Sequence, residues 1–368
     1  MRLILALAFV LAFAASLVLT ALMRCVAQRI GFVDMPGGRK QHAGPMPRGG
    51  GVAIVLATCI VIFGAAAAAY ALRRDPALWP VPGGLAEDVA LAADKLHFLL
   101  YILGGGLAIA FLGLWDDIRP FRPVTKLICQ FIIVSVIVVT SGMRINLFIP
   151  SDLAQVAVTV VWIVLLTNSF NLLDNTDGLS GTVAFICGGA LLVLSLQTTQ
   201  FFIAGFALAL MGAVLGFLFF NFPPASIFMG DTGSMFIGYM LATAAVLTTF
   251  VTHDQASPLF PLAVPLVLFA VPLYDTASVL VIRFRRHKPL LEGDRNHFSH
   301  RLLRLGMSAR RVLVTVGLVT AATALGATVP YGSSTWRVVT PVIQALCVLA
   351  VVMLLEIVSG ENRERPAE

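Results

Sequence analysis

The sequence predicts an all-α integral membrane protein, a polytopic chain with about eleven transmembrane helices. Two properties of the composition and one of the pattern predict this class. The 368 residues are 58% hydrophobic and only 12% charged, and the mean hydropathy of +0.92 lies far outside the range of soluble domains. Apolar runs of about twenty residues, long enough to cross ~30 Å of hydrocarbon, recur from the first residues to Glu356.

The apolar runs follow one another without a polar block long enough for a separate soluble domain. We therefore expect one transmembrane domain over residues 1–358 and a short polar cytoplasmic tail over 359–368. The first run is longer than the ~7–15 apolar residues of a signal peptide, which favours a membrane helix. In chain order, the expected spans are 3–22, 51–72, 98–115, 127–141, 154–168, 179–197, 201–220, 234–251, 259–282, 311–329 and 337–357.

The distribution of Lys and Arg predicts the orientation of these spans. If the spans alternate in direction, 19 of the 25 basic residues lie on one side of the membrane, in segments 23–50, 116–126 and 283–311 and in the tail. Cytoplasmic loops carry an excess of Lys and Arg. The N-terminus is therefore expected outside, and those segments and the C-terminus in the cytoplasm.

Five polar segments lie on the predicted cytoplasmic side. Loops are polar in general, so a single charged residue there indicates little. Five such segments on one side nevertheless predict a site at the cytoplasmic ends of the helices. They are 37–51, 113–126, 168–181, 220–234 and 283–302.

Two adjacent acids, Asp116 and Asp117, directly follow an apolar run. A carboxylate costs ~2.5–3.5 kcal/mol at the centre of a membrane helix and less near the interface, and neighbouring carboxylates repel each other. A divalent cation would remove both costs. Because the nearby candidates are Asp and Asn oxygens without a cysteine cluster, we expect Mg²⁺, with Mn²⁺ as the alternative, and a substrate that carries phosphate.

The stretch "NSFNLLDNTDGLSG", residues 168–181, adds three amides and two acids between two apolar runs. On a helix, Asn168, Asn171 and Asn175 would share one face, and Asp174 and Asp177 would widen this polar arc to roughly half the circumference. Gly178 would end the helix. Helix caps and Asx-turns account for one or two of these residues but not for five.

Basic residues in the same segments suit a phosphate-bearing substrate. His297 and His300 are three residues apart, so on a helix they would share a face. Four further residues favour the alternative role of contacting anionic lipid: Arg283, Arg285, Arg286 and Lys288. Those expected at the site include Lys40, His42, Lys126, Arg295, His297, His300 and Arg301.

Asp231 is expected at a loop-to-helix junction, since "GDTGS" at 230–234 precedes an apolar run. A helix N-terminus favours anions there, although Asp231 could also serve only as the N-cap. The sequence contains no G-x-x-x-x-G-K-[ST] motif, so it gives no support to ATP-driven transport.

These motifs, in this order, resemble those of the polyprenyl-phosphate N-acetylhexosamine-1-phosphate transferases, the glycosyltransferase 4 family. The resemblance extends from about residue 34 to about residue 305. "GLWDD" with Lys126 is similar to G-x-x-D-D with a downstream lysine, and "FMGDTGS" to F-x-G-D-x-G-S. Residues 168–181 are similar to N-x-x-N-x-x-D-x-x-D-G-L-x-G, and "GDRNHFSHRL" to the terminal histidine motif.

The resemblance implies transfer of a sugar 1-phosphate from a UDP-sugar to undecaprenyl phosphate, with release of UMP and a requirement for Mg²⁺. It implies that Asp116 deprotonates the lipid phosphate, and it leaves direct attack and an aspartyl-phosphate intermediate both open. With it, the expected catalytic residues are Asp116, Asp117, Asp174 and Asp177, and the expected metal ligands are Asn171, Asp231 and Asp117. The expected substrate-binding residues are Lys40, His42, Lys126, Asn168, Asn221, Arg295, His297, His300 and Arg301.

Two residues depart from the family pattern. Asn175 stands where glycine is frequent, and Ser299 interrupts what is often a longer histidine run, which makes the role of His300 less certain than that of His297. The histidine motif and "RKQHAGPMPRGGG" at 39–51 are closer to the UDP-GlcNAc branch than to the muramoyl-pentapeptide branch.

We therefore expect a multi-pass enzyme of the bacterial cytoplasmic (inner) membrane with its site on the cytoplasmic face. Its partners would be a UDP-sugar, undecaprenyl phosphate and the bilayer, without nucleic acid, and whether it forms a homodimer stays open. A polyprenyl-lipid transporter or flippase is the main alternative; it would need ionisable groups near the bilayer midplane, where only Asp275 and Glu356 lie within spans. An inactive scaffold of the same fold is the second alternative.

Overall fold

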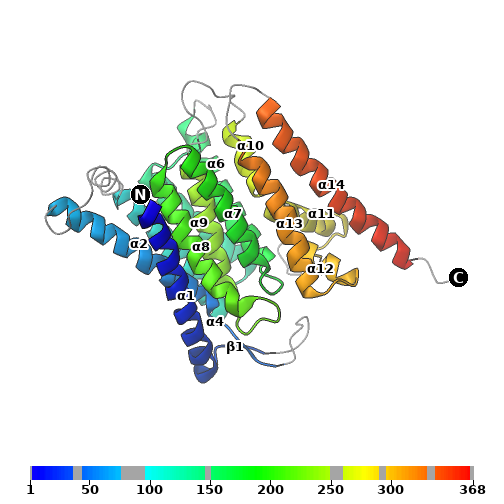
Figure 1. Cartoon of the computed structure of the whole chain (residues 1–368). Helices are drawn as coiled ribbons and strands as arrows, with labels where there is room; N and C mark the ends of the chain where they lie inside the picture. Colours follow the sequence, from blue (N-terminus) through cyan, green and yellow to red (C-terminus); the bar gives the residue numbers. More distant parts are fainter. Residues whose placement is uncertain are drawn as a thin grey trace.

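The computed structural model describes residues 2–35, 44–75, 96–145, 151–248, 260–289, 296–329 and 336–364. These residues form a helical bundle, apart from a two-residue strand pair in which β1 (Val33–Asp34) runs antiparallel to β2 (Met46–Pro47) (Figure 1). The helices are α1 (Arg2–Ile30), α2 (Gly50–Arg74), α4 (Leu96–Ile118), α5 (Pro123–Ser141), α6 (Asp152–Leu173), α7 (Leu179–Gln197), α8 (Phe201–Asn221), α9 (Gly230–Leu247), α10 (Phe260–Leu268), α11 (Ala270–Arg285), α12 (Phe298–Arg304), α13 (Ala309–Ala327) and α14 (Trp336–Glu364).

Eight helices in the described part of the chain are long and apolar enough to cross a membrane: α1, α2, α4, α5, α6, α7, α8 and α13. Many of their large apolar side chains are exposed, for example Leu11 on α1 and Ile132 on α5, as expected for a surface that faces lipid. The prediction of an all-α polytopic membrane protein is therefore confirmed. The count of eleven spans and their orientation stay predictions.

Helix α9 is the core of the bundle (Figure 1). Every residue from Thr232 to Ala245 is buried, because α2, α4, α6, α7 and α8 all pack against this helix. Its sequence, with Gly, Ala and Thr among Met, Phe and Leu, suits contact with protein on all sides rather than with lipid. This central position fixes the place of its first turn, which carries Asp231.

The first helix belongs to this bundle, because α1 packs closely along α8. A Cβ atom at Gly212 would lie 2.3 Å from the carbonyl oxygen of Phe9, and one at Gly216 would lie 2.6 Å from that of Phe13. Ser16 on α1 also donates its hydroxyl to the carbonyl of Ala213 at 2.5 Å. Small residues four apart allow two membrane helices to approach in this way.

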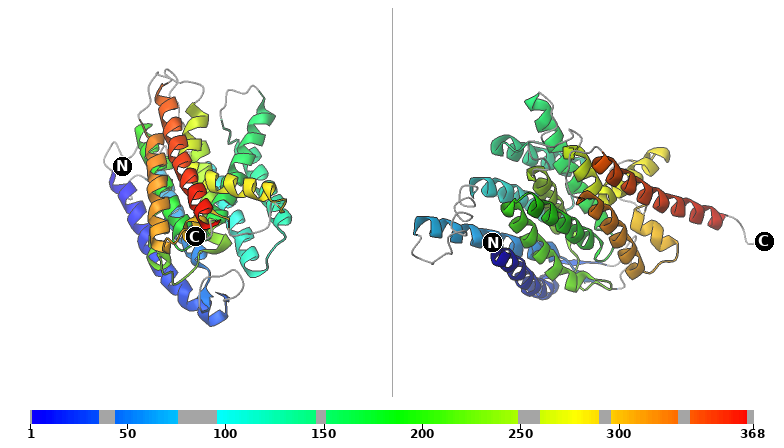
Figure 2. Two further views of the ribbon diagram at one scale, coloured as in Figure 1. Left: turned by 90° about the vertical axis from the view of Figure 1, so that its right-hand side faces the viewer. Right: turned by 45° about the horizontal axis from the view of Figure 1, so that its top comes forward.

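The expected span 259–282 is wrong as one continuous helix, because the chain breaks at Phe269 into α10 and α11. Pro272, in the first turn of α11, has no N–H to donate to the carbonyl of Leu268. The thiol of Cys187 on α7 contacts that carbonyl instead, at 3.5 Å. After the break, α11 runs across the direction of α13 and α14 (Figure 2, left).

The expected helix through residues 168–177 is also wrong, since α6 ends at Leu173. The amide of Asn175 donates to the carbonyl of Leu172 at 2.7 Å and so takes the place of a backbone N–H beyond the helix end. Gly178, with φ of 71°, precedes α7 rather than ending α6. Asp174, Asn175 and Asp177 therefore lie in the short connection 174–178 and not on a helical face.

Helices α2, α4 and α9 meet at their ends with almost no side chains between them. A Cβ atom at Gly51 would lie 2.2 Å from the backbone nitrogen of Gly233, and one at Gly113 would lie 2.5 Å from the carbonyl oxygen of Asp231. The glycines in "RGGG" and "GLWDD" therefore allow direct backbone contact at the helix ends, beside the acids that follow in the sequence.

We predict that Gly113→Ala destabilises the protein by about 1–3 kcal/mol, because the added methyl group overpacks the contact between α4 and α9. The measurement is the thermal unfolding midpoint of detergent-solubilised protein. Gly104→Ala on the same helix is the matched control, since a Cβ atom there meets nothing within 4 Å. An equal shift for the two variants would contradict the assigned close approach.

Candidate active site

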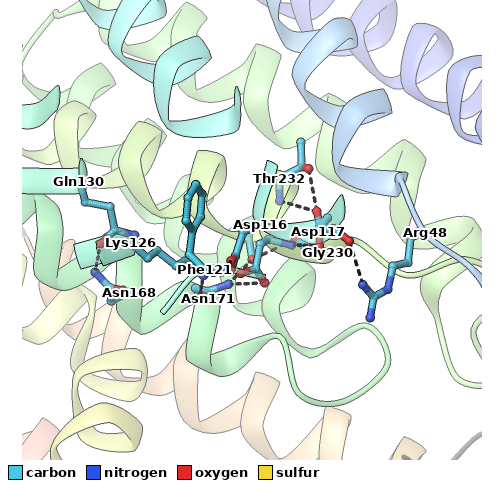
Figure 3. Close-up of polar contacts among 12 residues, drawn as sticks. Arg48, Asp116, Asp117, Phe121, Lys126, Gln130, Asn168, Asn171, Gly230 and Thr232 are labelled. Carbon is cyan, nitrogen blue, oxygen red and sulfur yellow. Dashed lines mark hydrogen bonds and ion pairs between the residues drawn. The ribbon is translucent and has the colours of Figure 1, made fainter. Parts of the chain in front are cut away.

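The described parts of the five polar segments meet at one end of the bundle, as expected for a single site. Arg48 donates to the carbonyl of Asp117 at 3.3 Å, and the backbone of Phe228 donates to Pro47 at 2.9 Å. The backbone of Ala225 donates to Asp177 at 2.9 Å. The bond of Arg48 joins the start of α2 to the end of α4 (Figure 3). The other two bonds join the connection after α8 to β2 and to the connection after α6, so the ends of α2, α4, α6 and α8 contribute to one surface.

Asp117, on the last turn of α4, caps the N-terminus of α9. Its Oδ1 accepts from the backbone nitrogen of Asp231 at 3.0 Å, and its Oδ2 accepts from the backbone nitrogen and hydroxyl of Thr232 at 3.0 and 2.8 Å (Figure 3). The residue before α9 makes no side-chain cap of its own. A carboxylate is unfavourable at the C-terminus of its own helix and favourable at the N-terminus of another, so this contact offsets the cost of Asp117 on α4.

Asp116 has partners of its own. Its Oδ1 accepts from the backbone nitrogen of Phe121 at 2.6 Å, and its Oδ2 accepts from Nζ of Lys126 at 3.0 Å. The two adjacent carboxylates are therefore stabilised separately, Asp117 by a helix N-terminus and Asp116 by an ammonium group. The sequence predicted a metal ion because the carboxylates of Asp116 and Asp117 should repel each other. In the structure, protein groups offset part of this repulsion.

Lys126 brings Asp116, Asn171 and Asp231 together around one ammonium group. Nζ donates to Oδ1 of Asn171 at 3.1 Å and forms an ion pair with Oδ2 of Asp231. Asn171 in turn donates to Oδ1 of Asp231 at 2.9 Å and to the hydroxyl of Ser234 at 3.0 Å. Oxygen atoms from α4, α6 and α9 thus converge on one point (Figure 3).

Asn168 lies one turn before Asn171 on α6, but its amide points to α5. It donates to Oε1 of Gln130 at 2.6 Å and to the carbonyl of Val164 at 2.8 Å. Gln130 is one turn after Lys126, so this bond holds α5 and α6 together beside the ammonium group. The expected substrate contact of Asn168 stays a prediction.

Asp174, in the connection after α6, is surrounded by negative charge. Desolvation raises the pKa of its carboxyl well above the usual range, and the charges of Asp231, Asp117 and Asp177 raise it further. The folded protein therefore disfavours the carboxylate form of Asp174.

Asp177 and Asn221 connect the two loops behind the site. Besides the bond between Asp177 and Ala225, Oδ1 of Asn221 accepts from the backbone nitrogen of Gly178 at 2.9 Å, and its Nδ2 donates to the carbonyl of Ile227 at 2.9 Å. Asn221 is buried, and both ends of its amide are used by backbone groups. Its expected contact with substrate stays a prediction beside this structural role.

The two histidines lie together at the start of the short helix α12, but the expectation that both lie on one helical face is wrong, since only His300 is on the helix. His297 immediately precedes the helix and His300 is in its first turn, with 6.3 Å between the ring centroids. His297 is buried, and its Nδ1 lies 2.9 Å from Oδ2 of Asp275 on α11. Asp275 was not among the residues expected at the site, although a lone acid within an apolar span was a signal for it.

Asn175 and Ser299, the two departures from the family pattern, are bonded to each other. The hydroxyl of Ser299 donates to Oδ1 of Asn175, which also accepts from the hydroxyl of Thr176 at 3.0 Å. This contact joins the connection 174–178 to α12. Lys40, His42 and Arg295 lie outside the described residues, so their expected contacts stay predictions.

Within the described residues, no group of three or more His, Cys, Asp or Glu side chains is arranged to hold a metal ion. This does not argue against Mg²⁺, which is commonly bound by one or two carboxylates, several waters and substrate phosphates rather than by a cage of protein ligands. Asp231 and Asn171 supply hard oxygen atoms at the point where Lys126 now lies. Asp117, the third expected ligand, directs both oxygens to α9.

Comparison with known proteins decides the family. A family model described as glycosyl transferase family 4 matches residues 99–249. The decaprenyl-phosphate N-acetylglucosaminephosphotransferase of Mycobacterium leprae (strain TN) is 30% identical over 332 residues, which cover 84% of this chain and 79% of the relative. The chain belongs to glycosyl transferase family 4.

Other relatives agree with the resemblance seen in the sequence motifs, which is thereby confirmed. The probable undecaprenyl-phosphate N-acetylglucosaminyl 1-phosphate transferase of Bacillus subtilis (strain 168) is 29% identical over 89% of this chain and 86% of its own length. The undecaprenyl-phosphate alpha-N-acetylglucosaminyl 1-phosphate transferase of Yersinia pestis is 26% identical over 82% of this chain and 78% of its own. The segment matched by the glycosyl transferase family 4 model contains Asp116, Lys126, Asn171 and Asp231.

We predict that Asn175→Ala and Ser299→Ala each lower the thermal unfolding midpoint, and that the double variant loses less than the sum of the two, because one bond is removed in all three. Coupling of contacting residues is about 0.5–3 kcal/mol. The control pair is Asn175→Ala with Ser308→Ala, since Ser308 caps α13 instead. Additive losses for Asn175 and Ser299 would show that the bond contributes nothing.

We also predict that Asp174→Asn raises the thermal unfolding midpoint at pH 7 in the absence of divalent cations. Because the pKa of Asp174 is higher in the folded protein than in an exposed carboxyl, the folded state is penalised as pH rises above the ordinary carboxyl value of about 3.9. The difference from the native protein should therefore shrink as pH falls towards about 4. Asp152→Asn, at an exposed site on α6, is the control; a lower midpoint for Asp174→Asn at pH 7 would contradict the assigned repulsion.

Proposed function

We propose that this protein transfers N-acetylglucosamine 1-phosphate from UDP-GlcNAc to undecaprenyl phosphate. An oxygen of the lipid phosphate forms a bond to the phosphorus next to the sugar, the bond from that phosphorus to the bridging oxygen breaks, and UMP leaves with that oxygen. The product is a lipid-linked pyrophosphoryl sugar, the first intermediate of a cell-envelope polysaccharide. The names of the relatives in Bacillus subtilis and Yersinia pestis support the sugar and the lipid acceptor.

The observation that carries the proposal is the convergence of Asp116, Asn171 and Asp231 on Lys126 at one end of an apolar bundle. Transfer of a phosphoryl group needs fixed charges that position and neutralise phosphate oxygens, and it needs little covalent chemistry from the protein. A site at the end of membrane-spanning helices also suits one substrate from water and one from the bilayer.

In the proposed site, Asp231 and Asn171 hold Mg²⁺, whose bound charge would neutralise the diphosphate of the donor. Mn²⁺ is the alternative ion, and Asp117 is proposed as a further ligand. Lys126 orients Asp116 by donating to its Oδ2, so that the carboxylate of Asp116 can accept the proton of the lipid phosphate. Asp117 holds the first turn of α9, and with it the Asp231 carboxylate, in place.

The proposed location is the bacterial cytoplasmic membrane, with the site facing the cytoplasm. The excess of Lys and Arg in the segments that meet at the site supports this orientation. The N-terminus lies at the opposite end of α1 from the site (Figure 1), which agrees with an N-terminus outside. The proposal does not depend on whether the protein is a monomer or a homodimer.

Transport of polyprenyl lipid has no observation in its favour. An ionisable group on a transport path should face a cavity or the bundle interior near the midplane. Asp275, one of the two acids within the expected spans, has both oxygens occupied by the start of α12. It belongs to the same end of the molecule as the other acids.

We predict that purified protein in detergent releases UMP from UDP-GlcNAc when undecaprenyl phosphate and Mg²⁺ are present, and that EDTA stops the release. Asp231→Asn and Asp117→Asn should each lower the rate by at least about 100-fold, the size of loss typical for removing a fixed transition-state charge or its support. Asp117→Asn should also lower the unfolding midpoint, because an amide oxygen cannot replace both carboxylate oxygens at the start of α9.

Asp152→Asn is the activity control and should leave the rate unchanged, since Asp152 is exposed at the other end of α6. A panel of other UDP-sugars measures the specificity. If no UDP-sugar yields UMP and the protein instead moves the lipid across vesicle membranes, the transferase hypothesis is wrong and the transporter hypothesis is supported.

A further inference from the structure

A fully buried carboxylate on α11, Asp275, is not among the acids that the sequence motifs place at the site. Asp275 has no exposed surface, and the buried residues of α11 on either side of it include Val271 and Val279. A buried carboxylate is costly unless its oxygens are hydrogen-bonded. Here Oδ1 accepts from the backbone nitrogen of Phe298 at 2.5 Å, and Oδ2 lies 2.9 Å from Nδ1 of His297. Both partners belong to the start of α12.

The contact with Nδ1 determines how His297 can act. An ionised carboxylate only accepts hydrogen bonds, so an ionised Asp275 selects the form of His297 in which Nδ1 carries the proton. Nε2 is then the ring atom through which His297 can bind another group. Because Asp275 also binds the backbone of the next residue, it fixes the ring and the helix start together.

Further contacts of Ser299 and Arg301 keep α12 in this position. Ser299 bonds to Asn175 in the connection 174–178. Arg301 donates to the hydroxyl of Ser278 on α11 at 3.0 Å and to the carbonyl of Asn296 at 2.8 Å, with its guanidinium 5.9 Å from the centre of the Tyr274 ring. Helix α12 is thus held between α11 on one side and the loop that carries Asp174 on the other.

We infer that Asp275 is the positioning residue of the histidine pair: it orients His297 so that Nε2 is presented to a phosphate group of the substrates. This inference rests on the proposed transferase function. It assigns to Asp275 no contact with substrate, only the orientation of a residue that makes one. The break between α10 and α11 is part of the arrangement, because it gives α11 the direction in which Asp275 reaches α12.

The test is a mutant cycle on kcat/KM for UMP release, using Asp275→Asn and His297→Gln separately and together in the full-length protein. In Asp275→Asn the amide oxygen can still accept from Phe298, while its NH2 group disfavours the Nδ1–H form of His297. We expect Asp275→Asn to lower kcat/KM at least tenfold in the native background and less than twofold in the His297→Gln background. A purely structural role would lower it by the same factor in both backgrounds, and that result, or no loss in the native background, would overturn the inference.

Thr276→Val is the matched control, since Thr276 is buried on the same helix but bonds to Ser169 on α6. It should change kcat/KM less than twofold in both backgrounds. Should Asp275→Asn fail to accumulate in the membrane, Asp275→Glu replaces it in the cycle: it keeps a carboxylate and should show the same dependence on His297. Release of UMP by the native protein distinguishes the two possible failures. If the proposed function is wrong, the native protein releases no UMP; if only this inference is wrong, the native protein still releases UMP.

Discussion

The contact between Asp117 and the start of α9 is the constraint on which the rest of the site depends. It joins the negative C-terminal end of α4 to the positive N-terminal end of α9, so that each helix end compensates the other. The contact requires a close approach that two glycines allow: a Cβ atom at Gly113 would lie 2.5 Å from the carbonyl oxygen of Asp231, and one at Gly230 would lie 2.7 Å from Oδ2 of Asp117. Once it forms, Asp116 and Asp231 lie near each other although 115 positions separate them in the sequence.

Bringing those acids together creates an excess of negative charge that the fold offsets with one lysine. Lys126 enters from α5, and Asn171 from α6 completes the ring of oxygen atoms around its ammonium group. Asp174 lies at the margin of this cluster without such a partner among the described residues, and burial together with the charges of Asp231, Asp117 and Asp177 raises its pKa. Clustered oxygen atoms of this kind suit the proposed binding of a cation and of the phosphates that accompany it.

The histidine end of the site depends on a second device, the break in the helix before α11. A continuous helix through residues 259–282 would carry Asp275 along the bundle axis, whereas α11 runs across it and meets α12 (Figure 2, left). An acid that looks misplaced in an apolar span therefore becomes the partner of His297. In the same region, Asn175 and Ser299, which depart from the family pattern, bond to each other. Both contacts join segments that are far apart in the chain.

The sequence by itself determined the class of the protein, its family and the identity of most acidic and amide residues at the site. Hydropathy and motif spacing are local properties, so apolar runs, the Asp116 and Asp117 pair and the start of α9 at Asp231 could be read from neighbouring residues. Only the tertiary structure decided which group neutralises each acid, where α6 ends, that 259–282 breaks, and that Asp275 holds His297. Those outcomes depend on hydrogen bonds between helices whose relative placement is set by packing, which no local pattern contains.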